Sequence, residues 1–235
     1  MLLIQIDMKY SQIKPGIFIA RPNRFIAQVL VDGLPETVHV KNTGRCREIL
    51  QPGVTVILER AGHSGRKTRY SLIAAYKGEM LVNIDSQVPN EVIYQALRQG
   101  LVPEFANLIR IAKEVKFGNS RFDLYYETES EKGFVEVKGV TLERDGTALF
   151  PDAPTERGAK HLTELAEAVK SGYTGCVFFL IQMKGPRLFQ PNAVMDPKFA
   201  AALNFAVHNG VKALAYDSIV TEDGIAIGEP VKIDI

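Results

Sequence analysis

The chain has 235 residues, of which 46% are hydrophobic and 23% are charged, a balance that is typical of a folded globular protein and excludes a disordered or fibrous one. Its first ten residues have neither the basic start nor the apolar length of a secretory signal, and no later apolar run could span a bilayer. We therefore expect a cytoplasmic protein without a membrane partner. Cys46 and Cys176 lie in no metal-ligand spacing, which predicts free thiols.

The net charge of +1 conceals an asymmetry between the two parts of the chain. Residues 1–85 contain 12 lysines and arginines against 7 acidic residues, whereas residues 86–235 contain 16 against 20. A basic N-terminal part favours a polyanionic partner such as nucleic acid, although a solvated basic surface is the plain alternative.

Short runs of alternating apolar and polar residues fill the segment from Gly16 to Asp85. Each run ends in glycine, proline, aspartate or asparagine, as strands joined by tight turns do. The runs are GIFIARP, RFIAQVLVD, ETVHVK, VTVILER, YSLIAAYK and MLVNID. Five or six closely spaced strands predict a small barrel of the oligonucleotide-binding (OB) type, which we assign to a domain of residues 1–85.

The basic residues of this domain gather in three clusters, each at or beside a predicted turn. Phe25 and Tyr70 lie close to two of these clusters, and proteins that bind single strands combine backbone charge with base stacking in this way. The alternative is that these arginines and lysines only keep the loops soluble. The predicted nucleic-acid contacts are Arg21, Arg24, Lys41, Arg45, Arg47, Arg66, Lys67 and Arg69.

The pattern changes after residue 86. A helix is predicted from Asn90 to Gly100, and strand and helix patterns then alternate, with helices at 155–170 and 197–208. This order predicts an α/β domain with a mixed central sheet over residues 86–235.

Three polar residues interrupt two consecutive apolar strands of this domain. Asp123 stands in RFDLYYE, and Glu136 and Lys138 stand two positions apart in GFVEVKGVTL, so their side chains leave one strand face. Two carboxylates at a sheet edge suit Mg²⁺ or Mn²⁺, and the ammonium could orient a water or stabilise a phosphate in reaction. The alternative is a surface ion pair between Glu136 and Lys138.

The segment FPDAPTERGAKHLTEL predicts a helix capped by Asp152 or Thr155. Arg157, Lys160 and His161 project from one side of its first two turns and could bind a phosphate near the helix N-terminus. Pairing of Lys160 with neighbouring glutamates on a solvated face is the alternative.

The same segment carries a resemblance, together with VEVKGVTL, RFDLYY, HVKNTGRC and RPNRFIAQV. Over essentially its whole length the chain resembles the sugar fermentation stimulation protein A family. The resemblance implies an OB barrel followed by a domain of the PD-(D/E)xK nuclease type. It also implies binding of DNA rather than RNA and a role in regulating sugar (maltose) utilisation genes.

On this resemblance, Asp123 and Glu136 are the metal ligands, Lys138 is the catalytic lysine and Glu104 is an ancillary helix glutamate. One position departs from the family motif, because Phe122 and not proline precedes Asp123. Two functions therefore stay open. One is a DNA-binding regulator with little sequence preference, and the other is an active Mg²⁺- or Mn²⁺-dependent nuclease acting on DNA or RNA.

Overall fold

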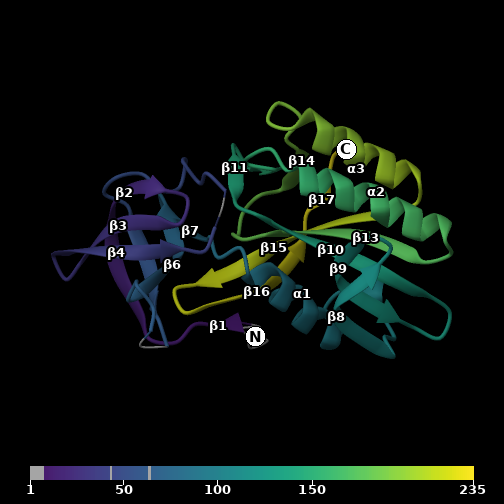
Figure 1. The fold of residues 1–235 in the computed structure, drawn as a ribbon, viewed down its shortest axis with the longest axis horizontal. Helices are drawn as coiled ribbons and strands as arrows, with labels where there is room; N and C mark the ends of the chain where they lie inside the picture. Colours follow the sequence, from purple (N-terminus) through teal and green to yellow (C-terminus); the bar gives the residue numbers. More distant parts are fainter. Residues whose placement is uncertain (1–7, 43, 63–64) are drawn as a thin grey trace.

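The first domain is a small closed barrel (Figure 1). The computed structural model describes residues 8–42, 44–62 and 65–235. A parallel pairing of β4 with β6 closes the sheet, and β7 extends it as a hairpin with β6. In β3 every second residue, Ala27, Val29 and Val31, is buried, because successive side chains of a strand point to opposite faces. The strands are β2 (Ile13–Asn23), β3 (Ile26–Val31), β4 (Leu34–Val40), β5 (Thr55–Arg60), β6 (Tyr70–Lys77) and β7 (Met80–Asn83).

The second domain is built on a seven-stranded mixed sheet with the order β1-β16-β15-β13-β10-β9-β8. Its centre is parallel, and β13 is apolar and buried from its second residue onward because both of its faces are covered. The strands are β1 (Met8–Lys9), β8 (Arg110–Phe117), β9 (Ser120–Glu127), β10 (Lys132–Val140), β13 (Thr174–Ile181), β15 (Lys212–Thr221) and β16 (Gly224–Pro230).

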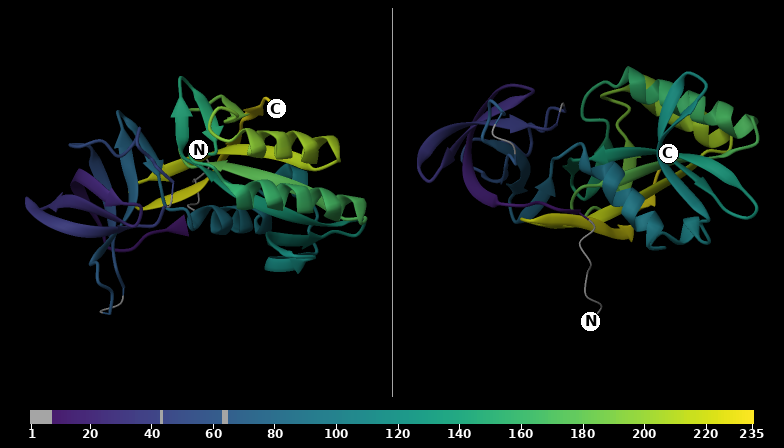
Figure 2. Two further views of the ribbon diagram at one scale, coloured as in Figure 1. Left: turned by 45° about the horizontal axis from the view of Figure 1, so that its top comes forward. Right: turned by 60° about the horizontal axis from the view of Figure 1, so that its bottom comes forward.

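Helices cover both faces of this sheet. Helix α1 (Val88–Arg98) lies on one face, and α2 (Glu156–Lys170) and α3 (Pro197–His208) lie side by side on the other (Figures 1 and 2). The Thr155 hydroxyl caps α2 by accepting a hydrogen bond from the Gly158 amide at 3.1 Å. A short 3-10 helix, η1 (Pro103–Phe105), follows α1.

A second, four-stranded sheet connects β10 with α2. It contains β11 (Leu142–Arg144), β12 (Thr147–Phe150), β14 (Leu188–Pro191) and β17 (Lys232–Ile233), in that order. The sheet returns the chain from the end of β10 to the start of α2, so that the first turn of the helix lies near the two strands that carry the predicted site.

The two domains share part of their core. Ile57 and Ile73 of the barrel pack in one apolar cluster with Val92 and Ile93 of α1. Hydrogen bonds add to this interface: the Asn83 amide donates to the Gln182 carbonyl at 2.9 Å, and the Arg45 amide donates to Asp152 at 2.8 Å. The barrel is therefore fixed against the α/β domain through both apolar and polar contacts.

The predicted barrel followed by an α/β domain with a mixed sheet is confirmed. Two features differ from the prediction. The strand β1 pairs with β16, so residues 8–9 belong to the sheet of the second domain, and the four-stranded sheet was not predicted. Among the residues that the structure describes, no helix is both long enough and apolar enough to cross a bilayer.

Candidate metal and phosphate site

Strand β9 leaves β10 at Asp123, and this separation creates the site. The two strands pair from Lys132 and Glu127 as far as Val135 and Leu124, where the ladder ends. Beyond that point the Val137 amide donates to Oδ2 of Asp123 at 2.8 Å, so a carboxylate replaces the neighbouring strand as its acceptor. The Asn90 amide of α1 donates to Oδ1 at 2.7 Å. Asp123 is thus fixed by two hydrogen bonds in the opening between the strands.

Glu136 lies in the middle of β10 and is only 2% exposed. Its Oε1 atom accepts hydrogen bonds from the Lys138 ammonium and from Nδ1 of His161, the latter at 2.6 Å. Its Oε2 atom is buried and has no hydrogen-bond partner among the described residues. A buried carboxylate oxygen without a donor is costly, which makes this atom a candidate ligand for a cation. The ion pair between Glu136 and Lys138 that was the alternative is present, but it is buried rather than on the surface.

The two carboxylates have opposite electrostatic environments. Burial and the charge of Glu136 raise the pKa of Asp123, and they outweigh the opposing effects of Lys138 and of the two hydrogen bonds. Burial also acts to raise the pKa of Glu136, but the Lys138 ammonium and the hydrogen bonds from His161 and Lys138 outweigh it and lower that pKa. Glu136 is therefore the carboxylate held ionised, and Asp123 is the one that a nearby cation would help to ionise.

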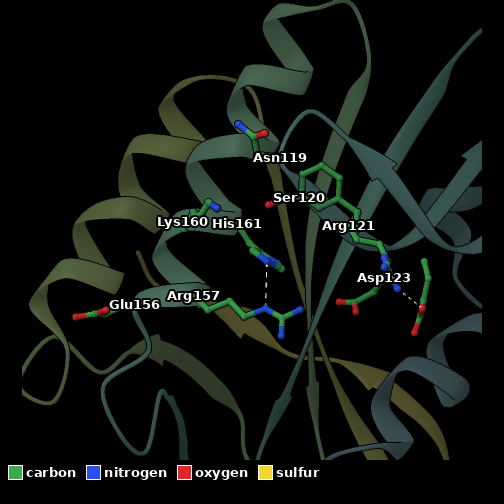
Figure 3. Close-up of a pocket in the computed structure, with 10 residues that line it drawn as sticks. Asn119, Ser120, Arg121, Asp123, Glu156, Arg157, Lys160 and His161 are labelled. Atoms are coloured by element: carbon green, nitrogen blue, oxygen red, sulfur yellow. Dashed lines mark hydrogen bonds and ion pairs between the residues drawn. The ribbon is translucent and has the colours of Figure 1, made fainter.

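A cavity of about 680 Å³ opens beside Asp123. Figure 3 shows Arg157 and His161 of α2 on one side of it and Asp123 and Arg121 of β9 on the other. Nε of Arg157 donates to Nε2 of His161 at 3.3 Å, while Arg121 pairs with Glu114 at 3.1 Å. The cavity thus places exposed cations near Asp123, as a site for a phosphate requires.

Comparison with known proteins gives the relationship of the chain. The model of the SfsA N-terminal OB domain matches residues 19–84, and the model of the sugar fermentation stimulation protein RE domain matches residues 87–224. The chain belongs to the sugar fermentation stimulation protein (SfsA) family. The predicted OB-type barrel followed by an α/β domain agrees with these two matches and with the strand order.

Relatives match the chain over almost their whole length. It is 56% identical to a sugar fermentation stimulation protein homolog of Alkaliphilus oremlandii, covering 97% of this chain and 99% of that protein. A homolog of Desulfitobacterium hafniense is 54% identical with the same coverage. The solved structure of Pyrococcus furiosus SfsA, described as a complex with Ca²⁺, is 28% identical and superimposes with a TM-score of 0.89 over 98% of this chain and 100% of that one.

The three helix residues expected to bind a phosphate in this SfsA-family chain, Arg157, Lys160 and His161, all line the cavity beside Asp123, but they differ in their contacts. His161 is 7% exposed and is bound to Glu136, so its ring faces the carboxylates. Lys160 is exposed and lies 3.8 Å from Glu164, the pairing that was the alternative. Arg157 is exposed at the cavity and is the member of the three that is best placed to meet a phosphate.

Glu104 lies away from the two carboxylates. It is in η1, where it accepts a hydrogen bond from the Tyr216 hydroxyl at 2.8 Å. Asn90 of α1 contacts Asp123 instead, and the sequence reasoning missed it. One signal was available, because Asn90 is a polar residue among the buried apolar positions of its helix. Arg121 was also missed, although it stands two positions before Asp123 on the same strand.

The predicted nucleic-acid contacts of the barrel fall into two groups. Arg21 donates to the backbone carbonyls of residues 24, 42, 44 and 45, and Lys41 pairs with Asp85 at 2.9 Å and with Glu59 at 3.4 Å. These two side chains are occupied in holding the protein together. The other six are exposed: Arg24, Arg45, Arg47, Arg66, Lys67 and Arg69.

Of the two aromatic residues near these clusters, Phe25 is the accessible one. Its ring is 49% exposed and lies 4.8 Å from the guanidinium of Arg24, whereas Tyr70 is buried. A cavity of about 620 Å³ is lined by Arg60, Arg66, Lys67 and Arg69. The barrel therefore offers one exposed aromatic ring and one concentrated group of cations.

Proposed function

We propose that this protein is a divalent-metal-dependent nuclease, whose barrel binds nucleic acid and whose α/β domain hydrolyses a phosphodiester bond. The buried, unpartnered Oε2 of Glu136 beside Asp123 carries this proposal. Oxygen atoms of this kind are the ligands that Mg²⁺ and Mn²⁺ take. The Ca²⁺ in the structure of Pyrococcus furiosus SfsA supports a divalent cation in this family.

Asp123 and Glu136 would hold the cation. Among residues 8–42, 44–62 and 65–235, no three His, Cys, Asp or Glu side chains cluster so that they could hold a metal by themselves. The two carboxylates of Asp123 and Glu136 fit Mg²⁺ or Mn²⁺, which commonly use one or two carboxylates and complete their shell with waters and substrate phosphate oxygens. When bound, such an ion neutralises phosphate charge and lowers the pKa of its water.

The chain's own residues would do the remaining work. Lys138 would orient the attacking water and stabilise the charge that builds up on phosphorus, and Arg157 would bind the non-bridging phosphate oxygens. Hydrolysis joins the water oxygen to phosphorus and breaks the bond from phosphorus to a sugar oxygen, which leaves with a proton. The other product is a phosphate monoester.

The barrel and the α/β domain would act on the same strand. A cavity of about 400 Å³ between the domains is lined by Arg24 and Gly44 of the barrel and by Gly139 and Thr155 of the α/β domain. Gly139 follows Lys138, and Thr155 caps the helix that carries Arg157. Because Arg24 lies over the Phe25 ring, a strand that stacks on Phe25 would enter this cavity beside the end of the strand that carries Glu136 and Lys138. We propose DNA as the partner, bound with little sequence preference. We also propose that the protein acts in the cytoplasm.

The first prediction concerns binding through the cations around the barrel cavity. Affinity for oligonucleotides should fall steeply with salt, because phosphate contacts release counterions. Replacing Arg66, Lys67 and Arg69 together by Gln should weaken binding and lower the slope of log affinity against log salt by about 2 to 3, close to one for each lost phosphate contact. Fluorescence anisotropy with single- and double-stranded DNA measures both quantities.

A matched triple variant controls for the lost charge. Arg187, Lys198 and Lys212 are exposed cations of the α/β domain, and replacing them by Gln removes the same charge. An equal loss of affinity in this variant would show that general attraction, and not the barrel cavity, causes binding.

The second prediction tests the metal site through Asp123→Asn. Mn²⁺ should raise the melting temperature of the wild type, since a ligand that binds only the folded state stabilises it by about 2.7 kcal/mol at 100 times its dissociation constant. The variant should show no such rise, because it lacks one of two charged ligands. Cleavage of DNA or RNA oligonucleotides with Mn²⁺ should be lost in the variant while anisotropy still detects binding.

Two outcomes of this experiment decide between the functions. Equal melting temperatures with and without Mn²⁺ in the wild type would refute the metal site. Stabilisation without cleavage of any substrate in a panel would support the DNA-binding regulator, with sugar utilisation genes as its targets. Since the pKa of Asp123 is raised, protons should compete with Mn²⁺ at a higher pH than at an ordinary aspartate, and the metal-dependent shift should shrink as the pH falls.

A further inference from the structure

The two hydrogen bonds that link Arg157, His161 and Glu136 are both donated toward the carboxylate. An arginine Nε atom carries one hydrogen and always donates, so the 3.3 Å contact requires a lone pair on Nε2 of His161. The ring proton is then on Nδ1, which lies 2.6 Å from Oε1 of Glu136 and donates to it. The two contacts together therefore favour the His161 tautomer that carries its proton on Nδ1.

The ring is also fixed in place. His161 stands in the second turn of a helix capped by Thr155, and it is 7% exposed. Its ring meets the edge of Phe122, with ring centroids 6.3 Å apart and planes at 79°. Phe122 immediately precedes Asp123, so one packed group adjoins both carboxylates. A rigid donor of this kind restricts the rotation of the carboxylate that it contacts.

The two carboxylate oxygens of Glu136 have different contacts. Oε1 accepts from both Lys138 and His161, and Oε2 accepts from no described residue. Lys138 alone could not maintain this difference, because its long side chain can follow either oxygen as the carboxylate turns. The ring of His161 cannot follow.

We propose that His161 is a positioning residue, kept in its Nδ1-protonated form by Arg157, which clamps Oε1 of Glu136 so that Oε2 is presented to the cation. This role rests on the proposed function, and it differs from the phosphate contact expected from the sequence. It also gives Arg157 a second task besides binding phosphate. Outer contacts of this kind orient the ligands of metal sites, and their loss typically lowers metal affinity about 10- to 100-fold.

Two amide variants separate the two ring nitrogens. In His161→Asn the side-chain NH₂ occupies the place of Nδ1 and can donate to Oε1, whereas in His161→Gln the amide lies one carbon further, near the place of Nε2. Isothermal titration calorimetry with Mn²⁺ should give an affinity close to the wild type for Asn and about 10- to 100-fold weaker for Gln. Cleavage should follow the same order, with the loss in kcat.

The controls keep the result specific. Lys170→Gln alters an exposed residue in the last turn of the same helix, outside the cavity, and should leave Mn²⁺ affinity unchanged. Melting temperatures of the metal-free variants show whether Asn and Gln are folded equally well. Nitrogen-15 NMR of the metal-free wild type should show the His161 proton on Nδ1, a measurement that needs neither metal nor activity.

The outcomes distinguish this role from the proposed function. Equal Mn²⁺ affinity in the wild type and in folded His161→Gln, or a proton on Nε2 in the NMR spectrum, would overturn the positioning role and leave the nuclease proposal intact. A wild type that binds no Mn²⁺ would overturn the proposed function and, with it, the role of His161. Loss with Gln and retention with Asn would support both.

Discussion

Glu136→Gln and Lys138→Met are expected to change Mn²⁺ affinity in opposite directions while both impair cleavage. Glu136→Gln removes the ionised ligand, so binding of Mn²⁺ should become undetectable. Lys138→Met removes a positive charge that pairs with Glu136 and repels a cation, so Mn²⁺ should bind more tightly. Loss of the ammonium should nevertheless reduce kcat by about 10²- to 10³-fold, the scale of losing one group that stabilises transition-state charge.

Calorimetry with Mn²⁺ and single-turnover cleavage of a labelled oligonucleotide measure the two effects separately. Lys184→Met is a suitable control, because Lys184 also pairs with a buried acid, Asp217, but lies outside the cavity beside Asp123. Tighter Mn²⁺ binding in Lys138→Met, with cleavage retained, would show that Lys138 is only a counter-ion. Weaker Mn²⁺ binding in that variant would contradict the assignment of Oε1 and Oε2 given above.

The site could be predicted from the sequence where it depends on neighbours along the chain. Glu136 and Lys138 share a strand face because they are two positions apart, and Asp123 stands on the preceding strand. The roles of His161 and Asn90 could not be predicted in this way. His161 meets Glu136 from 25 positions away, and Asn90 meets Asp123 from 33 positions away. Such contacts depend on how the helices pack on the sheet.

The fold shows the same division. The barrel strands β2 to β6 have six to eleven residues, which is long enough for a period of two to be recognised where it occurs, as in β3. The strands of the second sheet have only two to four residues, and β14 ends in a proline. No periodicity can be recognised over such lengths. Strand β1 has two residues, and its sequence does not indicate which sheet it joins.

Charge in the barrel illustrates how burial alters an interpretation based on composition. Eight basic residues fitted a nucleic-acid surface equally well in the sequence. The structure separates Arg21, whose guanidinium binds backbone carbonyls of the loop around Gly44, and Lys41, which is held between two acids. These two contribute to stability where an exposed cation would contribute to binding. Variants of Lys41 and Lys67 can measure this difference between a stabilising cation and a binding one.

Lys41→Met is expected to destabilise the protein by about 3 to 5 kcal/mol, the usual cost of removing one partner from a buried ion pair. The reason is Asp85, which is 1% exposed and would be left buried without the cation that pairs with it. Lys67→Met should change the free energy of unfolding by less than about 0.5 kcal/mol, because Lys67 is exposed. Urea unfolding measures both changes, and the double variant Lys41→Met with Asp85→Asn should recover much of the loss.

Nucleic-acid binding should show the reverse order. Lys67→Met should lower the salt slope of log affinity by about 1, the contribution of one phosphate contact, whereas folded Lys41→Met should retain the wild-type slope. Binding is compared at a temperature where Lys41→Met is still folded. If Lys41→Met were as stable as the wild type and lost affinity as Lys67→Met does, Lys41 would be a phosphate contact after all, and the ion pair with Asp85 would contribute little to the fold.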